Sequence, residues 1–408
     1  MKNKLSAKTT TFLQSHALSR LVGGLAALFA VFFMLFTPAF SAETFNIADY
    51  TKPEYGSGDG EKYFKWENTE NGLQLTETDK ANAQITAKYD TTQSHTHFKN
   101  TSDNSSMNIT GGSFVNQSSA IQNYSIYPST TPAKLGDIDA DFIGNCALGD
   151  LTAHDSYAAG GAIYNSSGSE TSEIGNITGN FIGNYASASH YIAAVVKGGA
   201  IYNGGSTIGD ITGDFIGNYV SASVPASASA SGGTSAKGGA IYNESSTIGN
   251  ITGDFIGNYA STRYYASGGA IYNYYNSTIG DITGDFVGNY AVSNDSNASG
   301  GAISNYDNST IGTITGDFIG NYAVSDSNSA SGGAISNSRG TIGDITGDFV
   351  GNYISGGIAM GGAISNYGTI GDISGSFINN TAESPNSLAL GGAIFSIASI
   401  NIDRKSVV

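Results

Sequence analysis

The chain has 408 residues, of which 12% are charged, and its 33 acidic and 17 basic side chains give a formal net charge of −16. Such an acidic surface repels nucleic acid and anionic lipid, so DNA and RNA binding are disfavoured. Cys146 is the only cysteine, which excludes an internal disulfide. We interpret it as a packed small side chain, and a reactive or metal-binding thiol is the alternative.

The first 42 residues predict a signal peptide. They contain four basic and no acidic residues, and the apolar run 21–36 is followed by small residues that include Ser41 and Ala42. This order is typical of a secretory signal peptide cleaved near Ser41 or Ala42. An uncleaved membrane anchor is the alternative, although the run is shorter than the ~20 residues that a spanning helix needs.

Residues 43–107 contain no repeat and include the only tryptophan, Trp66. Atypical segments commonly cover the exposed first coil of a solenoid, so we expect an N-terminal cap here. An independent recognition module is the alternative, and no motif supports it. His95 and His97 are a weak candidate for a metal pair.

Residues 108–402 consist of repeats. Each full copy opens with Gly-Gly-Ala-Ile, a degenerate copy opens at Ser118, and successive openings lie 29 to 42 residues apart. Such a period is typical of a solenoid of stacked units. We expect about nine coils, of which the last is incomplete. The full openings are at Gly160, Gly198, Gly238, Gly268, Gly300, Gly332, Gly361 and Gly391.

Comparison of the copies with one another indicates the core positions. The isoleucine of the opening and the phenylalanine of a later Phe-x-x-Asn motif recur, as Ile271 and Phe286 in one copy. Short apolar–polar alternations interrupted by glycine predict short strands joined by tight corners, and no stretch has sustained helical periodicity. We therefore predict an all-β fold, a parallel β-helix with roughly one coil per unit.

Two asparagine positions also recur, as Asn273 and Asn289 in the same copy. Identical asparagines stacked ~4.8 Å apart could hydrogen-bond along the stack. Alternatively, each could cap its own turn.

The segment between each Phe-x-x-Asn motif and the next opening varies most in length, from seven residues at 354–360 to eighteen at 220–237. Loops tolerate such insertions, so we expect variable loops on one face of the solenoid. Their Ser, Asn and Tyr residues are suited to adaptable contacts with a ligand. Alternatively, the loops are solvent-exposed connections with no binding role.

The repeats resemble a known family. Gly160-Gly161-Ala162-Ile163 followed by Phe181-Ile182-Gly183-Asn184, and the later copies of this pair, resemble the passenger domains of autotransporters, most closely the polymorphic outer-membrane protein repeats. The resemblance implies a right-handed parallel β-helix of the pectin-lyase type, displayed on the bacterial surface and in many cases adhesive. It also implies a C-terminal β-barrel that tethers the native chain to the outer membrane.

This sequence contains no such barrel and stops part way through a coil that opens at Gly391. We expect the native sequence to end at about Ile402 and the gene to continue. Residues 403–408 carry two bases in six residues and are interpreted as a non-native tail. A genuine basic tail is the alternative.

Two kinds of chemistry compete with adhesion. An enzyme should gather carboxylates with Arg or Lys at a break in the repeat. Here the bases Lys197, Lys237, Arg263 and Arg339 are scattered, and His154 and His190 occur singly. We therefore predict no enzyme and no catalytic, cofactor-binding or metal residues. A secreted polysaccharide-active enzyme stays as an alternative.

Structural Ca²⁺ is the second candidate, because stacked carboxylates repel one another and oxygen ligands suit this ion. The first row lacks an acid in three coils, and the nonapeptide pattern of calcium-binding repeats is absent. No cofactor is predicted, with structural calcium left open. The rows are Asp137, Asp210, Asp281, Asp344 and Asp372, and Asp141, Asp214, Asp254, Asp285, Asp317 and Asp348.

These features together predict an exported adhesin on the bacterial cell surface or outer membrane. Its partner would be a host or bacterial cell-surface ligand, either protein or glycan, bound through the one-sided loops. A non-binding surface filament is the other alternative. The sequence names no ligand.

Overall fold

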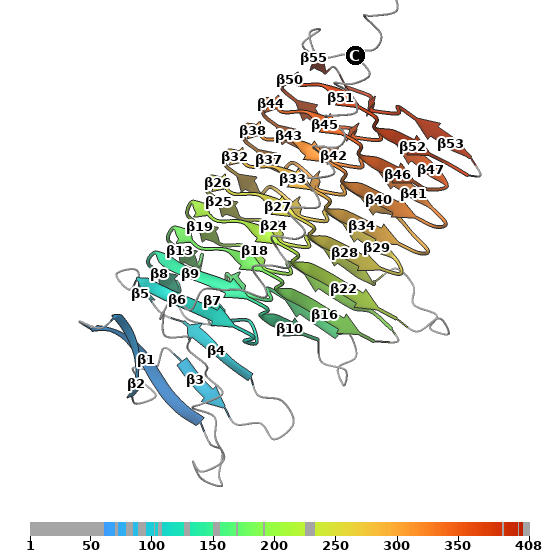
Figure 1. Cartoon of the computed structure of the whole chain (residues 1–408). Coiled ribbons are helices and arrows are strands. Elements are labelled where there is room, and N and C mark those ends of the chain that lie inside the picture. The colour runs from blue at the N-terminus through green and yellow to red at the C-terminus, as the bar shows by residue number, and fades with distance from the viewer. Residues whose placement is uncertain are drawn as a thin grey trace, which may run out of the picture. The chain divides into compact units, whose positions relative to one another are not determined.

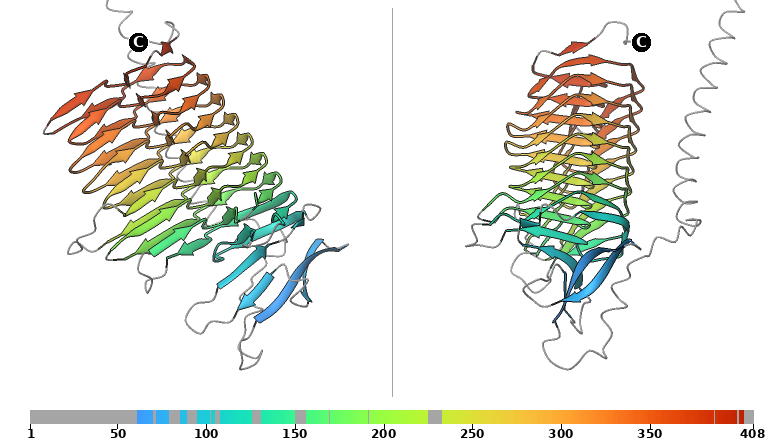
Figure 2. Two further views of the ribbon diagram at one scale, coloured as in Figure 1. Left: turned by 180° about the vertical axis from the view of Figure 1, so that it is seen from behind. Right: turned by 90° about the vertical axis from the view of Figure 1, so that its left-hand side faces the viewer.

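The computed structural model describes residues 61–69, 72–78, 85–88, 95–101, 103–104, 108–125, 131–149, 156–168, 170–190, 192–224, 233–385, 387–398 and 400–402. The predicted signal peptide and the final tail lie outside these residues. Every element within them is a β-strand. Figures 1 and 2 show the strands of successive coils lying one above another. The predicted all-β parallel β-helix is therefore confirmed.

From β7 to β53, each coil passes through three walls of a solenoid body and then through a projecting flange. Equivalent strands pair in parallel and in register, so that Ile271 pairs with Ile241 on one side and with Ile303 on the other. The first wall contains β7 (Ile121–Tyr124), β12 (Ile163–Ser166), β18 (Ile201–Gly204), β24 (Ile241–Glu244), β30 (Ile271–Tyr274), β36 (Ile303–Tyr306), β42 (Ile335–Ser338), β48 (Ile364–Asn366) and β54 (Ile394–Ser396).

The second wall uses one short strand per coil, and the third wall mostly uses two. The second contains β5 (Asp103–Asn104), β8 (Lys134–Leu135), β13 (Glu173–Ile174), β19 (Thr207–Ile208), β25 (Thr247–Ile248), β31 (Thr278–Ile279), β37 (Thr310–Ile311), β43 (Thr341–Ile342) and β49 (Thr369–Ile370). The third contains β6 (Ile109–Val115), β9 (Ile138–Ile143), β14 (Ile177–Thr178), β15 (Phe181–Ile182), β20 (Ile211–Thr212), β21 (Phe215–Ile216), β26 (Ile251–Thr252), β27 (Phe255–Ile256), β32 (Ile282–Thr283), β33 (Phe286–Val287), β38 (Ile314–Thr315), β39 (Phe318–Ile319), β44 (Ile345–Thr346), β45 (Phe349–Val350), β50 (Asp372–Ser374), β51 (Phe377–Ile378) and β55 (Asn401–Ile402).

The flange consists of two eight-stranded parallel sheets, one leaving the body and one returning to it. The outgoing sheet contains β10 (Cys146–Leu148), β16 (Tyr185–Ser189), β22 (Tyr219–Ser223), β28 (Tyr259–Thr262), β34 (Tyr290–Ser293), β40 (Tyr322–Ser325), β46 (Tyr353–Ser355) and β52 (Thr381–Glu383). The returning sheet contains β11 (Ser156–Ala159), β17 (Ala194–Lys197), β23 (Ser235–Lys237), β29 (Tyr265–Ser267), β35 (Ala298–Ser299), β41 (Ser329–Ser331), β47 (Ile358–Met360) and β53 (Leu388–Leu390).

The flange occupies the segments for which we expect loops from the sequence. Ala186 and Ala188 alternate with Ser187 and Ser189, and the alanines are buried between the two sheets. Small side chains fill this narrow interior, so the segment forms strands without the large apolar residues that usually reveal them. In the described coils, the tips that join outgoing to returning strands, such as 294–297, contain no strand.

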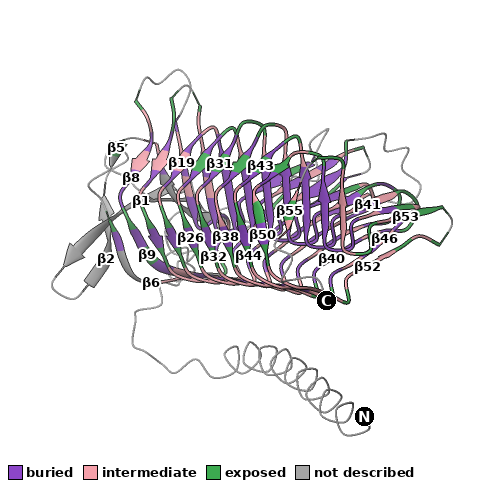
Figure 3. Ribbon diagram, turned by 90° about the horizontal axis from the view of Figure 1, so that it is seen from above, coloured by how far each residue is buried: buried purple, intermediate pink, exposed green. Residues whose placement is uncertain are grey.

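The body core consists of isoleucine and phenylalanine rows from the three walls (Figure 3). Phe286 is fully buried, and its ring stacks on those of Phe255 and Phe318 with centroids 4.8 Å apart. These rings are parallel because the register places identical residues directly above one another. Burial of each such side chain contributes roughly 1.5–3 kcal/mol.

Two columns of asparagines run through the body, and all of them are buried except Asn380, which is half-buried. In the first, Asn243 Nδ2 donates to Asn273 Oδ1 at 2.9 Å, and Asn273 Nδ2 donates onward to Asn305 Oδ1 at 3.0 Å. The stacking alternative is therefore confirmed. The first column contains Asn100, Asn123, Asn165, Asn203, Asn243, Asn273, Asn305, Asn337 and Asn366; the second contains Asn145, Asn184, Asn218, Asn258, Asn289, Asn321, Asn352 and Asn380.

Four further strands adjoin the first wall at the N-terminal end: β1 (Glu61–Thr69), β2 (Gly72–Thr78), β3 (Ile85–Lys88) and β4 (His95–Asn100). The first three pair antiparallel, whereas β4 pairs in parallel with β7. Asn100 Nδ2 donates to Asn123 Oδ1 at 2.8 Å. Parallel stacking thus begins at β4, N-terminal to the first repeat motif.

Candidate functional site

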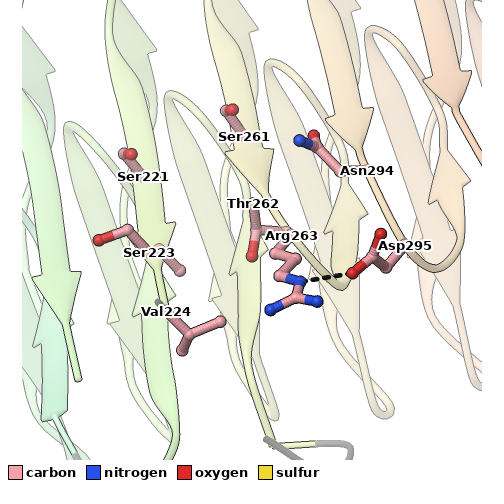
Figure 4. A pocket seen from close by; sticks show the side chains of 9 residues that line it. Ser221, Ser223, Val224, Ser261, Thr262, Arg263, Asn294 and Asp295 are labelled. Carbon is pink, nitrogen blue, oxygen red and sulfur yellow. Dashed lines mark hydrogen bonds and ion pairs between the residues drawn. The ribbon is translucent and has the colours of Figure 1, made fainter. Parts of the chain in front are cut away.

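A polar groove lies on the outer face of the outgoing flange sheet, beside the tips (Figure 4). Its volume is about 510 Å³, within the ~300–1,000 Å³ range of small-molecule sites. Strands β22 and β28, the short segments that follow them and the tip after β34 supply its lining. The lining residues are Ser221, Ala222, Ser223, Val224, Ser261, Thr262, Arg263, Asn294 and Asp295.

The register of the flange strands aligns the groove hydroxyls. Ser221 pairs with Ser261 in the adjacent strand, and Ser261 pairs with Val292 one coil further. Since alternate residues of a strand face opposite sides, Ser223 and Arg263 share the outer face with the two paired serines. The serine hydroxyls are therefore aligned across β22 and β28, and Val292 ends this polar row in the next coil.

Arg263 forms one side of the groove and is held in place by several contacts. Its Nε donates to Asp295 Oδ2 on the next tip, as the dashed line in Figure 4 shows. The guanidinium also lies 5.5 Å from the ring centroid of Tyr264. The backbone N–H of Asp295 donates to the Arg263 carbonyl at 2.7 Å. Contacts of this kind hold the charged pair in a fixed geometry.

A second cluster, the lysine corner, lies where the returning flange sheet meets the first wall. Lys197 Nζ donates to Glu244 Oε2 at 2.7 Å and lies 4.7 Å from the ring centroid of Tyr242. Lys237, one coil further, lies 5.1 Å from the ring centroid of Tyr272. The structure thus brings together two bases that are forty residues apart in the sequence.

Burial sets the chemistry of the lysine corner. Tyr242 and Tyr272 point out of the body, yet they are buried at 1% and 5% exposure because they pack beneath the flange. Burial lowers the pKa of the Lys237 ammonium, and the charge of Lys197 lowers it further, while Glu244 opposes this shift. The cation–π contacts and the packing of the tyrosine rings in the lysine corner hold the flange against the body.

The opposite side of the flange base carries a tyrosine ladder. The rings of Tyr259 and Tyr290 stack with centroids 4.8 Å apart, and burial raises the pKa of Tyr290 to about 12. Cys146 occupies the same row and pairs in register with Tyr185. Burial raises the pKa of the Cys146 thiol, so little reactive thiolate forms at neutral pH. The ladder contains Tyr185, Tyr219, Tyr259, Tyr290 and Tyr322.

Comparison of the chain with known protein families, curated proteins and solved structures finds no match.

The aspartate rows make regular contacts along the third wall. Asp281 Oδ1 accepts the Thr313 N–H at 2.7 Å, and Asp285 Oδ1 accepts the Asp317 N–H at 2.8 Å. Each such carboxylate therefore binds an amide of the next coil. No group of three or more His, Cys, Asp or Glu side chains in the described part of the chain is arranged to hold a metal ion. Structural calcium at these rows stays an open alternative.

The remaining residues singled out from the sequence lie apart. Arg339 contacts Asp307 at 3.8 Å and stacks over Tyr306 between the first and second walls. The His190 ring, near a flange tip, accepts the Ile192 N–H at 3.1 Å. His154 and the side chains of His95 and His97 lie outside the described residues. Within those residues no helix has the length and apolar character of a membrane span.

The sequence did not point to the groove. Its key residues, Arg263 and Asp295, are 32 positions apart and belong to tips of different length. Only strands already aligned in the flange bring them together. The only signal in the sequence was the presence of opposite charges in two successive variable segments. Such charges do not predict an ion pair until the register of the strands is known.

Proposed function

We propose that the chain is the surface-displayed β-helical passenger of an autotransporter-like protein and acts as an adhesin. The observation that carries the proposal is the flange, in which regular sheets support tips that vary from coil to coil. The tip after β46 is Gly356–Gly357, whereas the tip after β34 runs from Asn294 to Asn297. A rigid scaffold with variable connecting segments is the usual arrangement of a recognition surface.

The flange suits adhesion because its strands hold the tips in fixed positions. Serine, asparagine and tyrosine at such positions offer adaptable hydrogen bonds and rigid contact area. Rigid presentation also lowers the conformational entropy lost on binding. The repeat resemblance and the predicted export support display at the bacterial cell surface.

The test uses the full chain coated on beads and applied to cultured epithelial cells and to bacterial cells. In the test variant, Asn294–Asn297 is replaced by Gly-Gly, the length of the natural tip at Gly356–Gly357. The control is Tyr275→Ser between the first and second walls, where Ser245 adopts the same φ of 54° one coil earlier. We expect the tip variant alone to lose at least tenfold in bead attachment.

Three other results would contradict the proposal. Attachment that survives shortening of every tip would place binding elsewhere. No attachment by the unchanged protein to either cell type would favour the non-binding filament. Depolymerisation of a polysaccharide by the secreted chain would instead favour the enzyme alternative.

A further inference from the structure

We infer that the flange groove binds a neutral saccharide. This inference rests on the proposed adhesive function and names the ligand class of one part of the same surface. It depends on the chemistry of the groove lining, the fixed geometry of that lining and its charge.

The groove offers several kinds of hydrogen-bonding group in a small space. The Ser221, Ser223 and Ser261 hydroxyls both donate and accept, as does the Asn294 amide, while the Asp295 carboxylate accepts. A sugar ring presents closely spaced hydroxyls, each of which also donates and accepts. Planar amide, carboxylate and guanidinium groups can contact two neighbouring hydroxyls at once.

The lining of the groove is also preorganised for ligand binding. Asn294 N–H donates to the Thr262 carbonyl at 3.3 Å, and the Asp295 N–H binds the Arg263 carbonyl. These bonds join the two tips that carry the planar side chains. Val224 at the edge adds an apolar surface for the C–H face of a ring. Little ordering is then needed on binding, which favours affinity for small polar ligands.

Charge favours a neutral ligand over an acidic one. Arg263 is paired with Asp295, so the two charged side chains that line the groove cancel. Asp326 lies exposed on the next tip, and the whole chain carries a net charge of −16. An acidic saccharide would approach against this field and would compete with Asp295 for the guanidinium.

The lining disfavours a protein ligand. Protein interfaces concentrate their binding energy in buried aromatic and arginine anchors that fill pockets. No aromatic side chain is among the described groove-lining residues, and the one arginine among them, Arg263, is already paired with Asp295 and lies over the Tyr264 ring. A hollow, polar, aromatic-free surface suits a small hydroxyl-rich ligand better.

The first experiment measures binding of the full chain to immobilised oligosaccharides. The neutral probes are lactose, mannotriose and N-acetylchitotriose, and the acidic probes are sialyllactose and a heparin tetrasaccharide. We expect at least one neutral probe to bind and both acidic probes to bind at least tenfold more weakly. Preference for an acidic probe would overturn the charge argument.

Two variants locate the site. Ser261→Val removes a groove hydroxyl, and the fold accommodates valine because Val292 occupies the paired position in the next coil. Arg263→Ala removes the guanidinium. We expect each to weaken binding at least tenfold. The matched controls are Ser187→Val, in the same serine row but outside the groove lining, and Arg339→Ala, which removes another Arg–Asp–Tyr group. Both controls should bind normally.

The outcomes separate this inference from the adhesin proposal. Neutral probes that bind equally well to Ser261→Val and Arg263→Ala would place the saccharide site elsewhere and overturn the inference. Cell attachment that depends on the tips but survives removal of cell-surface glycans would also overturn it and indicate a protein ligand, leaving the adhesin proposal intact. Probe binding in the groove without any cell attachment would support the saccharide inference. The same result would contradict the adhesin proposal.

Discussion

Replacement of Asn289 by alanine tests how much the second asparagine column contributes to stability. Asn289 is fully buried, and its oxygen accepts the backbone and side-chain N–H groups of Asn258, both at 2.9 Å. Its amide donates to Asn321 Oδ1 at 3.0 Å and to the Phe255 carbonyl at 2.8 Å. Alanine removes all four hydrogen bonds at once.

The expected loss follows from the groups left behind. The Asn258 backbone N–H and the Phe255 carbonyl each lose a partner inside the solenoid. An unsatisfied buried group costs about 1–3 kcal/mol, so we expect Asn289→Ala to lower the free energy of unfolding by about 3–5 kcal/mol. The exposed Thr283→Ala in the same coil is the control and should change it by less than ~0.5 kcal/mol.

The assay combines guanidinium unfolding, followed by far-ultraviolet circular dichroism, with amide hydrogen exchange. Exchange is needed because repeat proteins can open locally, so a single unfolding curve can miss a local effect. We expect the Asn258 amide to exchange much faster, while the distant Asn165 coil stays protected. A loss below ~1 kcal/mol with Asn258 still protected would show that the column contributes little to stability.

Four other predictions address the corners, the tyrosines and the thiol. Gly288→Asn should cost less than about 1–2 kcal/mol in guanidinium unfolding, because Gly288 has φ +63° with open space at Cβ and Asn379 takes φ 54° at the equivalent position. Gly269→Ala should cost more than ~3 kcal/mol or prevent folding, because its Cβ would lie 2.0 Å from the Gly301 oxygen. Burial raises the pKa of Tyr185 from 10.0 to about 12, so the contribution of Tyr185 to stability is complete below pH 10 and is lost as the pH rises through about 12. Between these two pH values the Tyr185→Phe variant should therefore lose less stability than the unchanged protein. Denaturant midpoints measured across this pH range check the prediction. Iodoacetamide should alkylate Cys146 in the folded protein at least tenfold more slowly than in guanidinium, as followed by mass spectrometry, and equal rates would contradict the effect of its partial burial.

The sequence was sufficient to predict the body of the solenoid. Ile271, Phe286 and Asn289 each have a counterpart in neighbouring copies, and identical residues at a fixed period must lie above one another if the units stack. Their side-chain types then specify an apolar interior with internal hydrogen bonds. Stacking and core composition therefore follow from repetition alone.

The flange and its groove could not be predicted in the same way. Alternating alanine and serine, as in Ala186–Ser189, bury too little apolar surface per residue to be distinguished from loop sequence. The flange strands form because each pairs in register with the equivalent strand of the neighbouring coil. The groove depends further on unequal tips, as at Arg263 and Asp295, whose contact follows only from the register of the sheets.

The asparagine columns have a direction. In both columns each amide donates to the oxygen of the following coil, as Asn258 does to Asn289 and Asn289 does to Asn321. The side-chain dipoles therefore point the same way and polarise one another, and hydrogen-bond chains of this kind strengthen as they lengthen. A coil in mid-stack is thus more stable than the same coil beside an end. Tolerance to a damaging substitution should accordingly rise with distance from the ends, even though the repeats are nearly identical.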